Sequence, residues 1–564
     1  MEVGVEVASG DLAHVEGSRL RAAGLTRSAN AALVVLSLSA IAYLVLILLT
    51  FRYGRDQGIY AVVGDVVLSG GAPYRDAWDF KPPFIYFIYA GARGLFGPGM
   101  GSIRLVEALG LLSLVIAFAV LSGRFVGNWR AGLVGAALAA FVHVKLEFWH
   151  TAQPESFGGI IVAWAIVCAT YVAQGASRRS ERRQYAAWFG AGALYTIAAL
   201  LKPPLGGGFV VSLGFVLAAQ GRTLTPGERP KGMLRVCVAF GLGAVTVLGA
   251  TLSFFALKGS LGDLYETFFV FTPQYTGLGF EPPKLPSLLI HAVRQGVTHF
   301  SVLIPLGLAF LAGLTSRGDR AVSGVLHVLG VVAIQLLGVA MQAKFFDYHY
   351  GATLPLLSLL AGWGLWKLWQ RVFTDPVRVA AVLLLVGLVV HHAPKLTTPA
   401  EVSTGAKLYA RTRLLFGESS PAVLDWLHSK GDVSFGANVE MARWLRDNTE
   451  DDETLFIWGF EPIVYDLAAR GFASRYIYNV PQRLDWPGAK AARDELMSDL
   501  ERTRPDVVLV TRGDVFTHVT GDGRDSFAML GEFDELGHFL NVGYSLEGNI
   551  EDFMIYTRRP EALD

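Results

Sequence analysis

Charged and aromatic side chains gather just after the first long apolar segment of the chain. Asp56 opens this region, Tyr74 and Asp76 follow, and Lys81 stands directly before two prolines. A carboxylate can take a proton from a hydroxyl group, and a lysine can neutralise a phosphate. Aromatic rings between charges suit neither a solvated loop nor a lipid-facing helix. These residue types therefore predict a lipid-linked polar substrate at a membrane surface.

The composition of the 564-residue chain is that of an integral membrane protein. Hydrophobic residues make up 52% and charged residues 17% of the chain, and the mean hydropathy is +0.42. The formal net charge is zero, so no overall field favours nucleic acid, which we exclude as a partner. The two cysteines, Cys168 and Cys237, lie in apolar runs, which argues against a disulfide framework or a thiolate metal cluster.

Apolar runs of spanning or near-spanning length occur about eleven times along the chain. They lie near residues 29–51, 102–122, 131–147, 156–174, 186–201, 205–220, 236–257, 300–315, 321–342, 350–368 and 379–393. Arginine and lysine cluster in every second connection, which predicts a cytoplasmic N-terminal tail at residues 1–28. The tail has no signal-peptide pattern, so the first span is expected to remain as an anchor.

The outer connections carry most of the polar and aromatic residues, so function is predicted on that face. The longest of them is the loop 52–101. Within it, residues 84–96 are apolar but too short to cross the membrane, and two prolines precede them. We predict that this segment is an interfacial helix.

Residues 395–564 have the composition of a soluble domain, which follows a transmembrane domain at residues 29–394. Its expected elements are helices at 437–446, 461–470 and 488–503, strands at 454–458, 475–478 and 505–510, and a terminal hairpin at 537–557. Residues 395–436 have no clear periodicity and are predicted to be a linker or an irregular lid. The predicted fold is an α-helical multi-pass membrane protein with an extracytoplasmic C-terminal α/β domain.

The order of motifs in the outer loops resembles that of the C-type (GT-C) superfamily of polyprenyl-phosphate-dependent glycosyltransferases. This superfamily includes protein O-mannosyltransferases and lipid A aminoarabinose transferases. The matching residues are Asp56, Tyr60, Gly71, Pro73-Tyr74, Asp76, Lys81-Pro82-Pro83, Gly97, Gly101, Arg104, Pro154-Glu155, Leu201-Lys202-Pro203, Tyr348-His349-Tyr350 and Leu354-Pro355. The family as a rule has two acidic residues at the first motif, whereas Gln57 follows Asp56 here. Asp56 is therefore the single candidate at that motif.

The resemblance implies an inverting glycosyltransferase on the outer face of the cytoplasmic membrane. It would move a sugar from polyprenyl phosphate to an envelope glycan, lipid or protein. Asp56 is the expected base, and Lys81 and Lys202 are expected to hold the donor phosphate. For Asp56 the alternative is a solvated charge at a helix end beside Arg52 and Arg55. For both lysines the alternative is a side chain that snorkels to the interface.

The remaining candidates have weaker assignments. Glu155 would orient the acceptor or hold a sugar hydroxyl, the alternative being a charge that stabilises a helix start. Arg104 would assist the phosphate, the alternative being an interfacial anchor. Substrate contacts are also predicted for Tyr60, Tyr74, Asp76, Trp78 and His349. The rings of Tyr60, Tyr74, Trp78 and Trp149 are the candidate stacking surfaces for a sugar, although aromatic residues occupy this depth in membrane proteins generally. His349, with Asp347 and Lys344, would form a second ring of the acceptor site.

No cofactor is required by this chemistry. Asp56, Asp76, Asp79 and Glu155 offer oxygen ligands to a divalent cation, but no ligand spacing demands one. The competing class is a lipid or solute transporter or flippase, which predicts charges near mid-membrane and repeated halves, and the sequence has neither. The sequence does not identify the sugar or the acceptor.

Overall fold

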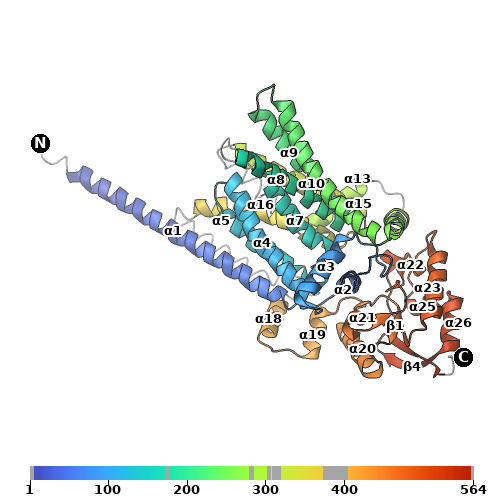
Figure 1. The fold of residues 1–564 in the computed structure, drawn as a ribbon. Helices are drawn as coiled ribbons and strands as arrows, with labels where there is room; N and C mark the ends of the chain where they lie inside the picture. The colour runs from blue at the N-terminus through green and yellow to red at the C-terminus, as the bar shows by residue number, and fades with distance from the viewer. Residues whose placement is uncertain are drawn as a thin grey trace.

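In the computed structural model, a bundle of long helices carries a smaller α/β domain at one end (Figure 1). The structure describes residues 6–171, 178–277, 285–300, 307, 319–372 and 404–560. The long helices are α1 (Glu6–Leu48), α4 (Gly101–Phe125), α5 (Arg130–Lys145), α7 (Pro154–Ala169), α8 (Arg178–Leu201), α9 (Gly208–Thr223), α10 (Arg229–Leu257), α15 (Asp319–Gln342) and α16 (Thr353–Val372). Each overlaps a predicted span. Of the other two predicted spans, 379–393 lies outside the described residues, as does 300–315 apart from residues 300 and 307.

Five segments in the described part of the chain are long and apolar enough to cross a membrane. They are Arg27–Leu48, Gly101–Phe125, Pro203–Thr223, Arg229–Leu257 and Arg320–Gln342. Shorter helices complete the bundle, and α7 and α16 are buried along most of their length. A helix that is apolar on all sides belongs in such a buried position. The predicted multi-pass helical fold is confirmed.

Glycine allows the central helices to approach closely. A Cβ atom on Gly362 of α16 would lie 2.6 Å from the Cα atom of Gly135 in α5. Only residues without a side chain permit this backbone contact. The glycine-rich sequence thus contributes to packing within the bundle.

The first outer loop contains two helices, of which the sequence predicted one. The predicted interfacial helix is α3 (Phe84–Phe96), and the unpredicted one is α2 (Arg55–Leu68). The side chain of Gln57 accepts a hydrogen bond of 2.9 Å from the Gly54 N–H and so caps the start of α2. Figure 1 shows α2 and α3 between the bundle and the C-terminal domain. Smaller outer elements are α6 (Glu147–His150), η1 (Pro203–Gly207), α11 (Leu261–Tyr265), η2 (Glu266–Phe271), α12 (Thr272–Gly277), α13 (Leu285–Phe300) and η3 (Asp347–Tyr350).

The C-terminal domain has a five-stranded mixed sheet in the order β2-β1-β3-β5-β4. Its strands are β1 (Thr454–Trp458), β2 (Gly471–Phe472), β3 (Val507–Thr511), β4 (Tyr544–Ile550) and β5 (Phe553–Arg558). β1 is parallel to both β2 and β3, whereas β5 is antiparallel to β3 and β4. Its helices are α18 (Thr404–Leu415), α19 (Pro421–His428), α20 (Phe435–Asn448), α21 (Ile463–Ala468), α22 (Val480–Arg483), α23 (Ala489–Thr503), α24 (Thr517–Thr520), α25 (Ser526–Leu530) and α26 (Asp534–Gly543).

Three predictions for this domain are wrong. The predicted linker contains α18 and α19, and the Ser420 side chain caps α19 by accepting from the Val423 N–H. Residues 475–478 form bends instead of a strand, because this segment packs on the first outer loop. The hairpin begins only at Tyr544, since α26 occupies the residues before it. The predicted strand at 454–458 and the helices near 437–446 and 488–503 are confirmed.

One continuous apolar core joins the first outer loop to the C-terminal domain. It includes Tyr60 of α2 and Tyr86 of α3 together with Trp458 and Val508 of the sheet. A separate core fills the membrane bundle. The C-terminal domain is therefore docked against the outer loop through buried side chains.

Candidate active site

The candidate site lies at the end of the bundle that carries the C-terminal domain, which is the predicted outer end (Figure 1). Its charged residues lie at or near the starts and ends of helices. Asp56 is in the first turn of α2, Glu155 is in the first turn of α7, and Lys202 directly follows α8. Lys81 precedes α3, and Tyr348 belongs to the short helix η3 before α16. Four separate segments of the chain therefore bring the predicted catalytic and phosphate-binding residues together. Arg104 is the exception.

The carboxylate of Asp56 is half-buried and is oriented by an amide. Its Oδ2 atom accepts a 3.2 Å hydrogen bond from Nε2 of Gln153. The Oε1 atom of Gln153 accepts from the Tyr60 hydroxyl at 3.0 Å, which fixes the amide with its nitrogen toward Asp56. Among the described residues Asp56 forms no ion pair. Its carboxylate is thus held in one direction but remains open to a substrate hydroxyl.

The ammonium group of Lys81 lies between aromatic rings. Its Nζ atom is 5.2 Å from the ring centroid of Phe80 and 5.8 Å from that of Tyr348. Within the described part of the chain it has neither an ion pair nor a hydrogen bond. Burial opposes its charged form, but Tyr348 and Asp56 raise the pKa of Lys81 well above its usual value. Lys81 therefore offers a positive charge that no protein carboxylate neutralises directly.

Lys202 and Glu155 form a buried ion pair beside Lys81. The side chain of Glu155 is 1% exposed, and Lys202 donates to its Oε1 atom. The Lys202 Nζ atom is 5.4 Å from the ring centroid of Tyr348, the same ring that Lys81 approaches. Two lysine ammonium groups thus converge on one tyrosine. Such a pair can stabilise the charge of a departing phosphate in a water-poor site.

His349 lies at the same face with a neutral imidazole. Its side chain is buried, and its ring centroid is 4.6 Å from that of Tyr348. Burial and the nearby Lys202 and Lys81 hold the pKa of His349 well below its ordinary value. Among the described residues its Nδ1 atom has no hydrogen-bond partner. The predicted proximity of His349 to the charged site is therefore observed.

Three of the four rings predicted as stacking surfaces for a sugar are covered by other protein groups. Tyr60 and Tyr74 are fully buried, and Trp78 is 6% exposed. Tyr74 stacks on Phe255 with 5.7 Å between ring centroids, and Trp78 meets Phe271 edge-on at 4.8 Å. The prediction that these rings form open stacking surfaces for a sugar is wrong, because the outer loop and the C-terminal domain enclose them.

Arg104 also differs from the prediction. Its guanidinium is fully buried and donates to Glu107 Oε2 at 2.8 Å, to Thr151 Oγ1 at 3.0 Å and to the Arg52 carbonyl at 2.9 Å. These internal bonds leave it unsuited to a donor phosphate. The carboxylate of Glu107 accepts in turn from the Ala152 N–H, next to Gln153. Arg104 thus supports the segment that carries Gln153.

Asp76 braces a turn of the first outer loop. Its Oδ2 atom accepts from the Ala72 N–H at 2.7 Å and from Arg75 at 2.6 Å. The hydrogen bond from Arg75 lowers the pKa of Asp76. These contacts explain the acidic residue at this position without a substrate contact.

Backbone strain occurs beside the candidate site. Tyr74, Ala152 and Phe345 have positive φ angles of 72°, 53° and 50°, a region that residues with a Cβ atom seldom occupy. Such conformations persist only where surrounding contacts fix them. At Tyr74 the contact is a 2.8 Å hydrogen bond from its hydroxyl to the Lys81 carbonyl.

Sequence reasoning did not assign roles to Gln153 and Tyr348, and it considered Asp79 only as a metal ligand. Gln153 directly precedes the Pro154-Glu155 motif, and Asp79 stands two residues before Lys81. Their proximity to recognised motifs could have identified Gln153 and Asp79 from the sequence. The carboxylate of Asp79 accepts hydrogen bonds from two tyrosine hydroxyls, and Glu155 is paired with Lys202. In the described residues no three His, Cys, Asp or Glu side chains form a group suited to a metal ion.

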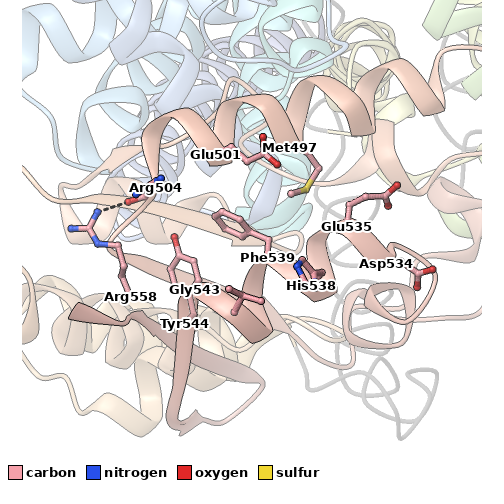
Figure 2. A pocket seen from close by; sticks show the side chains of 11 residues that line it. Met497, Glu501, Arg504, Asp534, Glu535, His538, Phe539, Gly543, Tyr544 and Arg558 are labelled. Carbon is pink, nitrogen blue, oxygen red and sulfur yellow. Dashed lines mark hydrogen bonds between the residues drawn. The ribbon is translucent and has the colours of Figure 1, made fainter. Parts of the chain in front are cut away.

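A well-formed pocket of about 570 Å³ lies elsewhere, in the C-terminal domain between α23, α26 and the terminal hairpin (Figure 2). Met497, Phe539 and Tyr544 form part of its wall, with Glu501 and Arg558 at its edges. None of the predicted catalytic or phosphate-binding residues lines it. This pocket is separate from the candidate active site.

Comparison with known proteins identifies a similar family and a similar fold. Residues 80–247 match a family model described as dolichyl-phosphate-mannose-protein mannosyltransferase. ArnT from Cupriavidus metallidurans, solved with undecaprenyl phosphate, is 13% identical with a TM-score of 0.54, over 95% of this chain and 98% of that chain. Its apo structure is 13% identical with a TM-score of 0.56, over 94% and 98% of the two chains. The chain has the GT-C fold.

The family match and this fold confirm the predicted resemblance to membrane glycosyltransferases of the polyprenyl-phosphate-dependent GT-C class. The matched segment contains Lys81, Glu155 and Lys202. The archaeal oligosaccharyltransferase AglB from Archaeoglobus fulgidus is also similar, at 13% identity and a TM-score of 0.42, over 94% of this chain and 75% of that chain. No curated protein matches the chain significantly.

Proposed function

We propose that this GT-C protein is an inverting glycosyltransferase that moves a sugar from polyprenyl phosphate to a hydroxyl group of a cell-envelope acceptor. The observation that carries the proposal is the carboxylate of Asp56 close to two lysines, Lys202 and Lys81, the second of which has no ion pair among the described residues. The undecaprenyl phosphate bound to ArnT and the dolichyl phosphate of the matched family support a polyprenyl-phosphate donor. The acceptor is a glycan, a lipid or a protein.

The reaction is a single displacement at the anomeric carbon of the donor sugar. The acceptor oxygen forms the new bond to that carbon while its proton passes to Asp56. The bond between the carbon and the phosphate oxygen breaks, and its electron pair stays with the phosphate. Lys81 and Lys202 stabilise the resulting charge on polyprenyl phosphate. Attack from the face opposite the leaving group inverts the configuration of the sugar.

Glu155 and His349 have supporting roles in this proposal. Glu155 holds Lys202 through one oxygen, and its Oε2 atom has no partner among the described residues. That oxygen is placed to accept a hydrogen bond from a sugar hydroxyl. His349, which is neutral, can contact the sugar or the acceptor without cancelling the lysine charges.

We place the reaction on the outer face of the cytoplasmic membrane, with the C-terminal domain outside the cytoplasm. The alternation of basic connections in the sequence supports this orientation. All the proposed catalytic groups stand at the end of the bundle that carries this domain. The lipid tail of the donor would remain in the bilayer while its phosphate meets the lysines.

The test is transfer of a labelled sugar from a set of synthetic polyprenyl-phosphate sugars to membrane extract by the purified full-length protein. Asp56→Asn is compared with Asp494→Asn, a control that removes an exposed carboxylate paired with Lys490. We expect transfer by wild type and Asp494→Asn, and a loss of about 100-fold or more in Asp56→Asn, in the range of general-base catalysis. Equal transfer by Asp56→Asn would remove Asp56 from the mechanism. Absence of transfer and of lipid-phosphate binding by wild type would contradict the proposed function and favour a transporter.

Addition of a chelator to the same assay tests the need for a divalent cation. The proposed chemistry relies on lysines, so we expect transfer to continue. A loss of transfer that is restored by added cation would show that carboxylates of the site also hold a metal ion.

A further inference from the structure

The C-terminal domain supplies a side chain to the loop that carries Lys81. Tyr478 lies between β2 and α22, and its hydroxyl donates a 2.6 Å hydrogen bond to Oδ1 of Asp79. The hydroxyl of Tyr86, from α3, donates to Oδ2 of the same carboxylate at 2.7 Å. Asp79 is 1% exposed. Both oxygens of this buried carboxylate are therefore satisfied by tyrosines from two different domains.

Tyr86 and a third tyrosine, Tyr74, fix the backbone of Lys81. The Lys81 carbonyl accepts from the Tyr74 hydroxyl at 2.8 Å and lies 3.1 Å from that of Tyr86. The loop segment from Asp79 to Lys81 is thus held at both ends. Tyr478 is the contribution of the C-terminal domain, 399 residues away from Asp79 in sequence.

Both oxygens of Asp79 depend on the tyrosine donors, because the carboxyl group is buried. Burial raises the pKa of Asp79, and the nearby Lys81 and the hydroxyls of Tyr478 and Tyr86 oppose this rise by favouring the carboxylate. A hydrogen bond to a buried carboxylate is worth more than one between neutral groups. Loss of the Tyr478 hydroxyl would leave one oxygen of Asp79 buried without this donor, so Asp79 and the adjoining loop would have to shift.

The position of Tyr478 is itself determined by neighbours of Lys81. The Trp78 N–H donates to the Arg475 carbonyl at 2.7 Å, and Nη1 of Arg475 donates to the Tyr74 carbonyl at 3.1 Å. The ring of Tyr478 lies 5.7 Å from that of Trp78. The bends at residues 475–478, where the sequence suggested a strand, are the consequence of this docking.

We propose that Tyr478 is a positioning residue for sugar transfer. Its hydroxyl fixes Asp79 and, through the backbone of the same loop, the direction in which Lys81 faces the donor phosphate. This inference rests on the proposed function and deepens it, because it makes the C-terminal domain part of the donor site. Domain docking and donor binding are then coupled through the contact between Tyr478 and Asp79.

The experiment compares Tyr478→Phe with Tyr544→Phe in the full-length protein. Tyr544 is a matched control, because its buried hydroxyl donates to the Pro505 carbonyl at 2.7 Å in the same domain. We expect Tyr478→Phe to raise the donor KM about tenfold, the effect of losing one hydrogen bond to a charged group, with the acceptor KM unchanged. Tyr544→Phe is expected to leave both constants within about twofold, since it removes only a neutral hydrogen bond far from the site.

A binding measurement separates this inference from the proposed function. Purified wild type, Tyr478→Phe and Tyr544→Phe are titrated with undecaprenyl phosphate, with intrinsic fluorescence as the readout. Weaker binding by Tyr478→Phe alone supports the inference whether or not a sugar donor has been found. Equal binding by all three proteins overturns it, and transfer by wild type would then leave the proposed function intact.

A second variant covers the case in which Tyr478→Phe does not fold. Asp79→Asn keeps the shape of the side chain but removes its charge, so it weakens both tyrosine contacts. We expect the same rise in donor KM, and no further rise when Tyr478→Phe is added, because the two residues act through one contact. Additive effects of the two changes, or an unchanged donor KM in Asp79→Asn, would contradict the role of Tyr478.

Discussion

Replacement of Gly58 by alanine tests how tightly the C-terminal domain holds the helix that carries Asp56. Gly58 lies early in α2 and faces Ile463 at the start of α21. A Cβ atom on Gly58 would lie 2.8 Å from the Ile463 Cβ atom and 3.0 Å from its Cα atom. Because these atoms cannot rotate away, the two helices would have to separate.

The expected cost follows from two opposing effects. Overpacking of this kind destabilises a protein by about 1–3 kcal/mol. Alanine in place of glycine inside a helix recovers about 0.5–1 kcal/mol. We therefore expect Gly58→Ala to lower the free energy of unfolding by about 0–2.5 kcal/mol. Asp56 stands two residues before Gly58, so the shift also displaces the base, and transfer should slow by about tenfold or more.

Gly91→Ala is the matched control. Gly91 lies in α3, and a Cβ atom there would meet nothing within 4 Å. The assay is thermal unfolding of both variants in detergent, together with the initial rate of sugar transfer. Gly91→Ala should match wild type or exceed its stability. If Gly58→Ala had the same unfolding temperature and transfer rate as Gly91→Ala, the close docking of α2 on α21 would be refuted.

Three further predictions concern single side chains. Gln153→Leu removes the donor to Asp56 and should lower kcat about tenfold with an unchanged donor KM, in steady-state kinetics; an unchanged kcat would exclude this orienting role. Lys202→Ala leaves Glu155 buried without its partner and should lower the free energy of unfolding by about 3–5 kcal/mol, as measured by thermal unfolding. Adding Glu155→Gln to this variant should restore part of the loss. Equal stability of Lys202→Ala and wild type would contradict the ion pair. Burial lowers the pKa of His428 from 6.5 to about 3, so its contribution to stability is present above pH 6.5 and is lost as the pH falls, by about 1.4 kcal/mol per unit. His428→Gln should flatten the unfolding temperature between pH 7 and pH 5, and an unaltered slope would exclude this source of acid sensitivity.

The spans and the charged face of the site were predictable because their signals are local. Apolar length marks a membrane helix regardless of its neighbours. Asp56, Lys81, Glu155 and Lys202 stand at helix boundaries on the predicted outer side, so topology alone gathers them. The strand at 454–458 was also predictable, because its apolar run is short and isolated.

The roles of the aromatic residues were not predictable from local sequence. The local sequence predicted exposed rings at the membrane interface for Tyr60, Tyr74 and Trp78. Groups that bury such rings are distant in the chain, as Phe271 and Tyr478 are from Trp78. The helix α2 escaped prediction for a similar reason. Its start carries Arg55, whose charge is buried because Asp432 and Glu461, both distant in sequence, accept hydrogen bonds from it.

For Arg104 the sequence did contain a signal. Glu107 lies three residues later, on the same face of α4, which is the spacing of a helical ion pair. This spacing favours an internal partner over a lipid phosphate. Neither the phosphate contact nor the interfacial anchor that was considered for Arg104 describes this buried ion pair.

The most direct test of the proposed mechanism is a single-turnover measurement with one radiolabelled polyprenyl-phosphate sugar that wild type consumes. Bound donor and released polyprenyl phosphate are quantified for wild type, Asp56→Asn and Lys81→Ala in the presence of membrane extract. The mechanism predicts that Asp56→Asn binds the donor but releases almost no polyprenyl phosphate, whereas Lys81→Ala binds the donor weakly. Release by Asp56→Asn at the wild-type rate, or donor binding by Lys81→Ala as tight as that of wild type, would contradict it.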